Sequence, residues 1–378
     1  MRLSPFGAGS HTRTLSPALL SAASLLRRLR PPRDAGVVPR LAAAVAVLSV
    51  LLVAVSIASL STGAVDISAS QVVAILLEPL GVHITDYSRT SELVVEQIRL
   101  PRIVVGALVG AALGVSGATL QGLFRNPMAD PGIIGVSAGG AAGAVISIAL
   151  GINTLFFLAL PLFAFGGAIG AAFLVYAIAA VGGRFSMSSL LLAGIAVAAF
   201  LNAVSSAVLI AAPTQDAARE ILFWLAGGLN SRGWDHVWLS APLIIGGTAV
   251  IVALSRDLNV MMVGDDDALA VGVNVRVLRP VLIGVAALVT GVSVAVSGTI
   301  TFIGLVVPHM LRLVFGPDHR VLIPASALGG AVMLVLADML ARTLLQPAEI
   351  RVGIVTSFVG APFFIFLLIR NKQRASAF

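Results

Sequence analysis

Long apolar stretches separated by short polar segments dominate the pattern of the chain. Each stretch has about 17 residues or more, the length that a helix needs to cross a hydrocarbon core of about 30 Å. Polar positions do not alternate with apolar ones, as they would in the strands of a membrane barrel. The pattern therefore predicts an all-α polytopic membrane protein with ten spans. The expected spans cover about 41–61, 103–123, 132–152, 155–182, 187–212, 237–255, 277–297, 299–315, 321–344 and 352–369.

Composition also favours a bilayer environment. Hydrophobic residues make up 58% of the chain and charged residues only 11%, whereas soluble domains carry about 25% charged residues. So few charged groups cannot cover a folded surface in water, and in lipid every spanning backbone must be hydrogen-bonded internally. The chain has no cysteine, which excludes disulfides, thiolate metal sites and cysteine nucleophiles.

The distribution of basic residues predicts the orientation of the spans. Ten spans put both termini on one side, and a cytoplasmic N-terminus places 17 of the 24 basic residues in the cytoplasm, as the positive-inside rule requires. This use of positive charge, without interleaved aromatics, argues against a nucleic-acid partner. We expect an inner-membrane protein with a disordered basic cytoplasmic extension at 1–40, a single transmembrane domain at 41–372 and a cytoplasmic tail at 373–378.

Three polar segments between spans are long enough to fold. Residues 68–77 are amphipathic and are expected to form a helix that lies on the membrane surface, on the side opposite the cytoplasm. Residues 217–229 are expected to form a short outer helix that ends at Gly227 and Gly228. On the cytoplasmic side, three consecutive aspartates at 265–267 precede an apolar stretch and predict a short helix with acidic caps.

A short internal echo relates two halves of the chain. Val115, Ser116 and Gly117 are followed by a second glycine and a proline, and the same order begins at 296–298. The two spans that carry the echo run in opposite directions. Inverted repeats of this kind are typical of transporters.

Within the spans, glycines and one charged pair are notable. Gly106, Gly110 and Gly114 recur every four residues, a spacing that predicts close helix packing. Asp338 and Arg342 lie four residues apart and are expected to pair on one helix face. Asp338 is the only acid well inside a span, whereas a proton-coupled carrier usually needs more.

The chain lacks the motif for ATP hydrolysis, and a protease-like match does not fit its context. The only lysine, Lys372, follows Asn371, so a Walker A loop is excluded. Residues 135–139 match a nucleophile elbow, but that motif needs a strand before the serine. We therefore expect no enzymatic activity and no bound cofactor or metal, and energy from an ion gradient or a separate subunit.

Two long sequence motifs resemble one family. The first runs through 99–102, 117–122 and 125–136, and the second through 302–309, 316–320, Asp338, Arg342 and 360–364. They resemble the permeases of importers for vitamin B12, ferric siderophores and haem, the FecCD-type permeases, over about residues 41–372. The extension at 1–40 departs from the usual short terminus of that family.

The resemblance implies a type II ABC importer permease. Such a subunit has ten spans, an inverted repeat of spans two to five against seven to ten, and a second copy of itself across the translocation path. Two separate ATPase subunits bind ATP and Mg below, and a periplasmic binding protein delivers the ligand above.

The resemblance also implies roles for particular residues. Arg99, Arg102 and Arg342 are similar to outer arginines that receive acidic side chains of the binding protein, and guanidinium groups suit carboxylates. Residues 263–274 are similar to coupling helices that contact the ATPase. The residues resembling a cytoplasmic gate are Asn126, Met128, Ser186, Met187 and Ser188. The coupling residues are Gly264, Asp265, Asp266, Asp267, Ala268, Leu269 and Gly272.

The substrate is inferred from aromatic residues near the outer mouth. The candidates for the substrate path are Phe223, Trp224, Trp234 and His236. The segment 221–229, together with Trp234, most resembles the haem branch of the family. A ferric-siderophore or cobalamin importer is the alternative. A proton-coupled carrier and a channel-like membrane protein are more remote alternatives.

Overall fold

The computed structural model describes residues 36–63, 65–181, 186–345 and 348–375, and this part of the chain is helical without a strand. The segments 1–35 and 376–378, for which a disordered extension and a tail are expected, lie outside the described residues. The α-helices are α2 (Val37–Ser61), α3 (Ala69–Leu77), α4 (Arg89–Leu93), α5 (Leu100–Leu123), α6 (Val136–Ala149), α7 (Ala159–Ala180), α8 (Met187–Ile210), α9 (Gln215–Leu225), α10 (Trp234–Ala253), α11 (Ser255–Val263), α12 (Asp265–Ala270), α13 (Val275–Ser297), α14 (Ile303–Phe315), α15 (His319–Thr343) and α16 (Val352–Ala375).

The ten predicted spans correspond one to one with ten of these helices. Among the described residues, 7 helices are long and apolar enough to cross a membrane, namely α2, the continuous Arg89–Leu123 segment, α7, α8, α10, α13 and α15. The shorter apolar helices α6, α14 and α16 supply the rest. The prediction of an all-α membrane fold is confirmed. Helix α2 begins at Val37 and α16 continues to Ala375; the domain limits stay a prediction.

Two of the shorter helices begin later than predicted, because left-handed residues interrupt the chain before them. A 3₁₀ turn, η3 (Pro131–Ile134), precedes α6 and ends at Gly135, which has φ +78°. Before α14, Gly298 has φ +68° and Phe302 has φ +69°. Positive φ breaks a right-handed helix, so the apolar runs before these points are not helical throughout.

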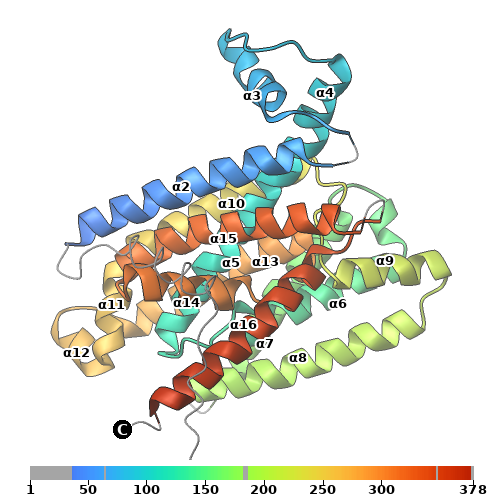
Figure 1. Ribbon diagram of the computed structural model, residues 1–378. Helices are drawn as coiled ribbons and strands as arrows, with labels where there is room; N and C mark the ends of the chain where they lie inside the picture. The colour runs from blue at the N-terminus through green and yellow to red at the C-terminus, as the bar shows by residue number, and fades with distance from the viewer. Residues whose placement is uncertain (1–35, 64, 182–185, 346–347, 376–378) are drawn as a thin grey trace, which may run out of the picture.

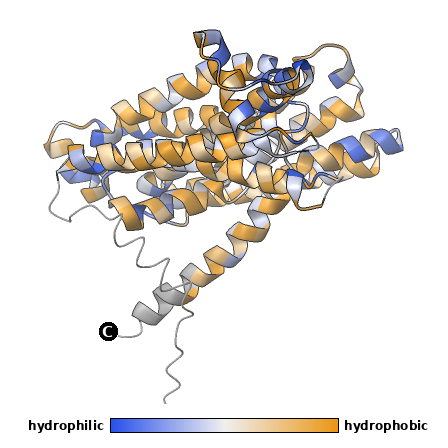
Figure 2. Ribbon diagram, turned by 45° about the horizontal axis from the view of Figure 1, so that its top comes forward, coloured by the Kyte–Doolittle hydropathy of each residue, from blue (hydrophilic) through white to orange (hydrophobic). Residues whose placement is uncertain are grey.

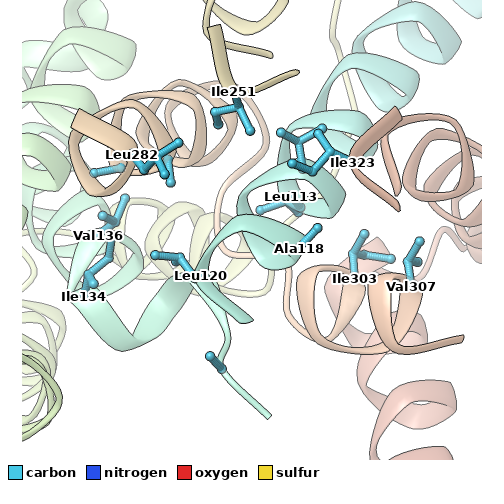
Figure 3. Close-up of a cluster of buried hydrophobic side chains, with 14 of the residues drawn as sticks. Leu113, Ala118, Leu120, Ile134, Val136, Ile251, Leu282, Ile303, Val307 and Ile323 are labelled. Atoms are coloured by element: carbon cyan, nitrogen blue, oxygen red, sulfur yellow. The ribbon is translucent and has the colours of Figure 1, made fainter. Parts of the chain in front are cut away.

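Helix α5 is the centre of the bundle. Most of its residues are buried, and it contacts α10, α13, α14 and α15. Figure 3 shows Leu113, Ala118 and Leu120 of α5 among side chains from α6, α10, α13, α14 and α15. Hydrophobic contacts in this core around α5 fix the positions of the helices that carry the candidate site residues.

Glycines allow α5 to approach its neighbours closely. A Cβ at Gly110 would overlap the carbonyl oxygen of Gly330 on α15, and one at Gly114 would overlap that of Ser326. Gly117, in the first echoing segment, meets the carbonyl oxygen of Gly304, which lies in the second echoing segment, in the same way. The predicted glycine packing is therefore confirmed. The two echoing segments lie directly against each other.

The polar segments form the two ends of the bundle. Figure 1 places α3, α4 and α9 away from the end at which α11 and α12 lie. The start of α2 and the end of α16 both lie toward the α12 end. Figure 2 shows hydrophobic residues along the long helices and hydrophilic ones gathered near these ends, as a membrane-embedded bundle requires.

Each of the three polar segments that were expected to fold contains a helix, namely α3, α9 and α12. Helix α3 begins with a capping box in which Ser68 and Gln71 satisfy each other's backbone N–H groups. Helix α9 has Thr214 as its N-cap and ends at Leu225, before Gly227 takes φ +65°. Helix α12 has all three predicted aspartates in its first turn.

Candidate functional site

A buried charged cluster joins α5 and α15 at the end of the bundle near α3 and α4 (Figure 1). The guanidinium of Arg102 donates from Nε to both oxygens of Asp338, each at 3.1 Å, and from Nη2 to Oδ1 at 2.9 Å. Arg342 donates from Nε to Asp338 Oδ2 at 3.1 Å, so the predicted pair is present together with a second arginine. Arg342 also donates to the carbonyl oxygens of Ser59 and Thr62 at the end of α2.

Arg99 holds the chain between α2 and α3. It lies in a π-helical turn, η2 (Val94–Arg99), and donates to the carbonyl oxygens of Leu60 and Val65. A side chain at Gly63 would collide with its guanidinium, at 2.7 Å from Nη2. Arg99 thus holds the end of α2 and the segment that follows it against the start of α5.

The three candidate docking arginines are therefore largely enclosed. Arg99, Arg102 and Arg342 are 6%, 9% and 7% exposed, and each bonds oxygens of its own chain. Arg102 also contacts a more exposed acid: its Nη1 donates to Glu349 Oε2 at 3.1 Å, and the Glu349 side chain is 38% exposed. A role in docking stays a prediction for all three arginines.

A second layer of contacts lies beside this cluster and was not predicted from the sequence. It consists of Glu349, Asn230, Arg351 and Phe223. Asn230 donates to Glu349 and accepts from Arg351 Nη1 at 3.0 Å. The Arg351 guanidinium lies 4.3 Å from the centre of the Phe223 ring, a cation–π geometry. The available signal was a charged residue, Arg102, next to a span, which predicts an acidic partner but does not identify Glu349.

A cavity of about 470 Å³ opens beside this layer, lined by Leu160, Asp216, Arg219, Glu220, Phe223, Trp224, Gly228, Asn230, Ser231, Arg232, Ser297 and Arg351. Three of its lining residues are arginines and two are acids. The indole N–H of Trp224 is buried and has no hydrogen-bond acceptor among the described residues. Burial, and then the charge of Arg351, lower the pKa of Arg232 to about 10. The cavity thus combines positive charge, two aromatic rings and an unused donor.

The four candidate substrate-path residues do not all meet at this cavity. Phe223 and Trp224 line it, both from α9. Trp234 instead donates from Nε1 to the carbonyl oxygen of Glu96 at 3.0 Å. His236 packs edge-on against Phe157, with ring centres 4.9 Å apart, and lies 3.1 Å from Arg232 Nη1. Trp234 and His236 therefore do not line this cavity.

The candidate gate residues lie at the other end of the bundle. Asn126 and Met128 are exposed in the turn after α5, and Asn126 Oδ1 accepts from the Met128 backbone N–H at 2.9 Å. Ser186 caps α8 by accepting from the Ser189 N–H, with Ser188 exposed and Met187 half-buried. Helix α8 then packs on the chain at Ile133, a few residues after Met128.

The candidate coupling segment presents both charge and apolar surface. Its first helix, α12, buries Ala268 beneath it. Val263, Leu269 and Val271 are 73%, 53% and 68% exposed, and Asp266 and Asp267 are exposed beside them. Gly264 precedes the helix, and Gly272, with φ +88°, follows it. An apolar patch with a charged border at a polar end is typical of a protein-binding surface.

Comparisons with known proteins agree with this arrangement. The chain is 47% identical over 289 residues to a cobalamin import system permease of Halobacterium salinarum, covering 76% of each chain. It is 40% identical over 282 residues to a hemin transport system permease of Yersinia pestis, covering 74% of this chain and 84% of that one.

A solved structure shares the whole architecture. It is an inward-facing conformation of a putative metal-chelate type ABC transporter, with a TM-score of 0.75 and 30% sequence identity over 86% of this chain and 98% of that chain. The model of the FecCD transport family matches residues 51–370. The bundle built around α5, the two polar ends and these relatives lead to one conclusion: the chain belongs to the FecCD transport family and is a multi-pass ABC importer permease.

Proposed function

We propose that this permease imports a metal tetrapyrrole, with haem as the first candidate, from the periplasm to the cytoplasm. The observation that carries the choice is the outer cavity. Its three arginines suit the carboxylates of haem, its aromatic rings suit a planar macrocycle, and the unpaired Trp224 N–H needs an acceptor. A corrinoid is the second candidate, favoured by the 47% identity to a cobalamin permease.

Energy is proposed to come from a separate ATPase that docks on α12. The exposed Val263, Leu269 and Val271 offer it apolar contact. A proton-coupled mechanism is not favoured, because the carboxylate of Asp338 is engaged in ion pairs with two arginines of the same chain. ATP and Mg would be bound by that partner, since this chain has no Walker A lysine.

A second copy of the chain is proposed to complete the path. The outer cavity of one copy would face the path between the two, and the gate residues of both copies would close it below. The apolar faces of α8 and α16 are available to a second copy or to lipid; Phe200 is 66% exposed and Phe358 is 77% exposed. A homodimer is what the family assignment implies, and this exposure is compatible with it.

At the outer end, the binding protein is proposed to reach the arginine cluster through Arg102. An acidic side chain arriving from above can take the place of Glu349 on Arg102 Nη1 without disturbing the buried contact to Asp338. Arg99 and Arg342 would then act by keeping that cluster in position.

The proposal is tested by ATP hydrolysis in the reconstituted complex of permease, ATPase and binding protein. The binding protein is supplied empty or loaded with haem, cyanocobalamin or a ferric hydroxamate siderophore. Haem is expected to stimulate hydrolysis most. Stimulation by cyanocobalamin alone would establish the second candidate, and stimulation by the siderophore alone would contradict a tetrapyrrole substrate.

A further inference from the structure

Asp265 connects three elements at the α12 end. It is the first residue of α12, and its carboxylate accepts from Arg279 Nη2 of α13 at 2.8 and 2.9 Å. The same Oδ1 accepts from Arg125 Nη2, in the turn after α5, at 3.3 Å. Acidic residues at 265–267 are expected at the start of a helix. Capping alone does not explain why two arginines from distant segments both contact Asp265.

Arg125 links this carboxylate to the candidate gate. It has φ +47°, a conformation that is uncommon for a residue other than glycine. Its Nη2 also donates to the carbonyl oxygen of Met261 on α11 at 2.7 Å. The next residue is Asn126, whose side chain holds the Met128 N–H. One guanidinium therefore ties α11 and α12 to the turn that carries both gate residues.

The two contacts of Asp265 differ in strength. The Arg279 contact is shorter, involves both carboxylate oxygens, and has an arginine whose side chain is only 19% exposed. The Arg125 contact is longer, and its two side chains are 46% and 45% exposed. Exposed pairs are weak and readily exchanged. Arg279 therefore fixes α12 to α13, and Arg125 is the contact that can open and close.

We propose that Asp265 and Arg125 are positioning residues that transmit movement of α12 to the gate turn at 124–130. The inference rests on the proposed function in one respect, namely that an ATPase docks on α12. When α12 moves with α13, the Arg125 contact breaks or forms, and the turn that holds Asn126 and Met128 is released or held. A two-state element of this kind gives coupling between distant sites a physical route.

The test uses the absence of native cysteine. Met128→Cys is introduced, the permease is assembled with its ATPase, and the rate of maleimide labelling is measured with and without ATP and vanadate. In this parent, nucleotide is expected to change the labelling rate. Arg125→Gln and Asp265→Asn are each expected to reduce that change by about two- to tenfold, and the double variant no further. Arg256→Gln, which removes an exposed charge on α11, is the matched control and should retain the full change.

The outcomes separate this inference from the proposed function. A nucleotide-dependent change that persists in Arg125→Gln would overturn the inference while leaving the transporter assignment intact. Effects that multiply in the double variant would overturn it as well, because they would show independent roles. A parent that neither binds the ATPase nor responds to nucleotide would instead defeat the proposed function, and the inference with it.

If Arg125→Gln does not assemble, Arg125→Lys, which keeps the charge, is expected to assemble and respond. Failure of the Arg125→Lys variant to restore the response would contradict the ionic link.

Discussion

The guanidinium of Arg102 on α5 donates hydrogen bonds to the carboxylate of Asp338 on α15, although 236 residues separate them in the sequence. Both groups are buried, with 9% and 1% of their surfaces exposed. A buried ion pair contributes little net stability compared with an apolar pair, yet removing one partner leaves an uncompensated charge. The contact therefore fixes how α5 and α15 meet at the end where the glycine-lined seam between them begins.

Replacing Asp338 with asparagine should strongly destabilise the protein. Arg102 and Arg342 would both lose their shared carboxylate, and breaking a buried pair costs about 3–5 kcal/mol. Thermal unfolding of the purified variant in detergent should show a clearly lower midpoint than the wild type. Asp216→Asn is the matched control, because its side chain is 95% exposed and lies 3.9 Å from Arg219; its effect should stay within about 0.5 kcal/mol. Equal midpoints for the two variants would mean that the buried cluster is not a structural element.

Adding one methyl group at Gly117 should separate α5 from α14. The new Cβ would overlap the carbonyl oxygen of Gly304, and overpacking of this kind costs about 1–3 kcal/mol. Gly117→Ala should therefore lower the unfolding midpoint and the yield of folded protein. The same substitution at Gly170 on α7 meets no atom within 4 Å, so it should be neutral or stabilise the helix by up to about 1 kcal/mol. If Gly117→Ala is as stable as Gly170→Ala, the close packing of the echoing segments is wrong.

Neutralising Glu349 should strengthen docking of the binding protein. Glu349→Gln removes the carboxylate that would compete with the binding protein for Arg102 Nη1 and leaves the contact to Asp338 in place. Because the Glu349 side chain is 38% exposed, little stability should be lost. The dissociation constant at low salt should fall by about two- to tenfold, with a steeper salt dependence. Glu92→Gln, from the exposed pair with Arg89, serves as the control. Weaker docking in Glu349→Gln would exclude Arg102 as the receiving group.

Asp318 should stabilise the protein until the pH becomes strongly acidic. Partial burial works to raise the pKa of this carboxyl, but hydrogen bonds from Arg320 and Asn259 outweigh it and lower the pKa to about 2. A carboxyl with a lowered pKa contributes stability above its unfolded pKa of about 3.9 and loses it as the pH falls toward the folded value. The difference in unfolding midpoint between wild type and Asp318→Asn should therefore be constant from pH 8 to about 5 and shrink only below about pH 4. A difference that already shrinks between pH 7 and 5 would contradict the lowered pKa.

Hydrophobic length and helix caps were sufficient to predict most of the fold. Each span must cross the same thickness of lipid, so its position follows from the apolar run, and α12 follows from its three aspartates. The starts of α6 and α14 could not be predicted in this way. They depend on positive φ at Gly135 and Phe302, and for a phenylalanine that conformation is imposed by tertiary packing rather than by local preference.

The candidate site was less predictable because its contacts are not local. Arg99 follows a polar segment and suggested an exposed residue, but the chain folds back so that Leu60 and Val65 enclose it. Glu349 meets Arg102 across 247 residues, and Arg125 meets Asp265 across 140. Sequence spacing shows which charges must find partners, whereas the identity of the partner depends on how the bundle closes.

Uptake into proteoliposomes tests the central claim, that a separate ATPase drives this permease. The chain is reconstituted alone, with the ATPase, and with both the ATPase and a haem-loaded binding protein outside, and each preparation receives either internal ATP or an inward proton gradient. We predict haem accumulation only in the complete assembly with ATP, and none with the gradient. Accumulation by the chain alone under a proton gradient, or leakage of haem without ATP, would contradict the account.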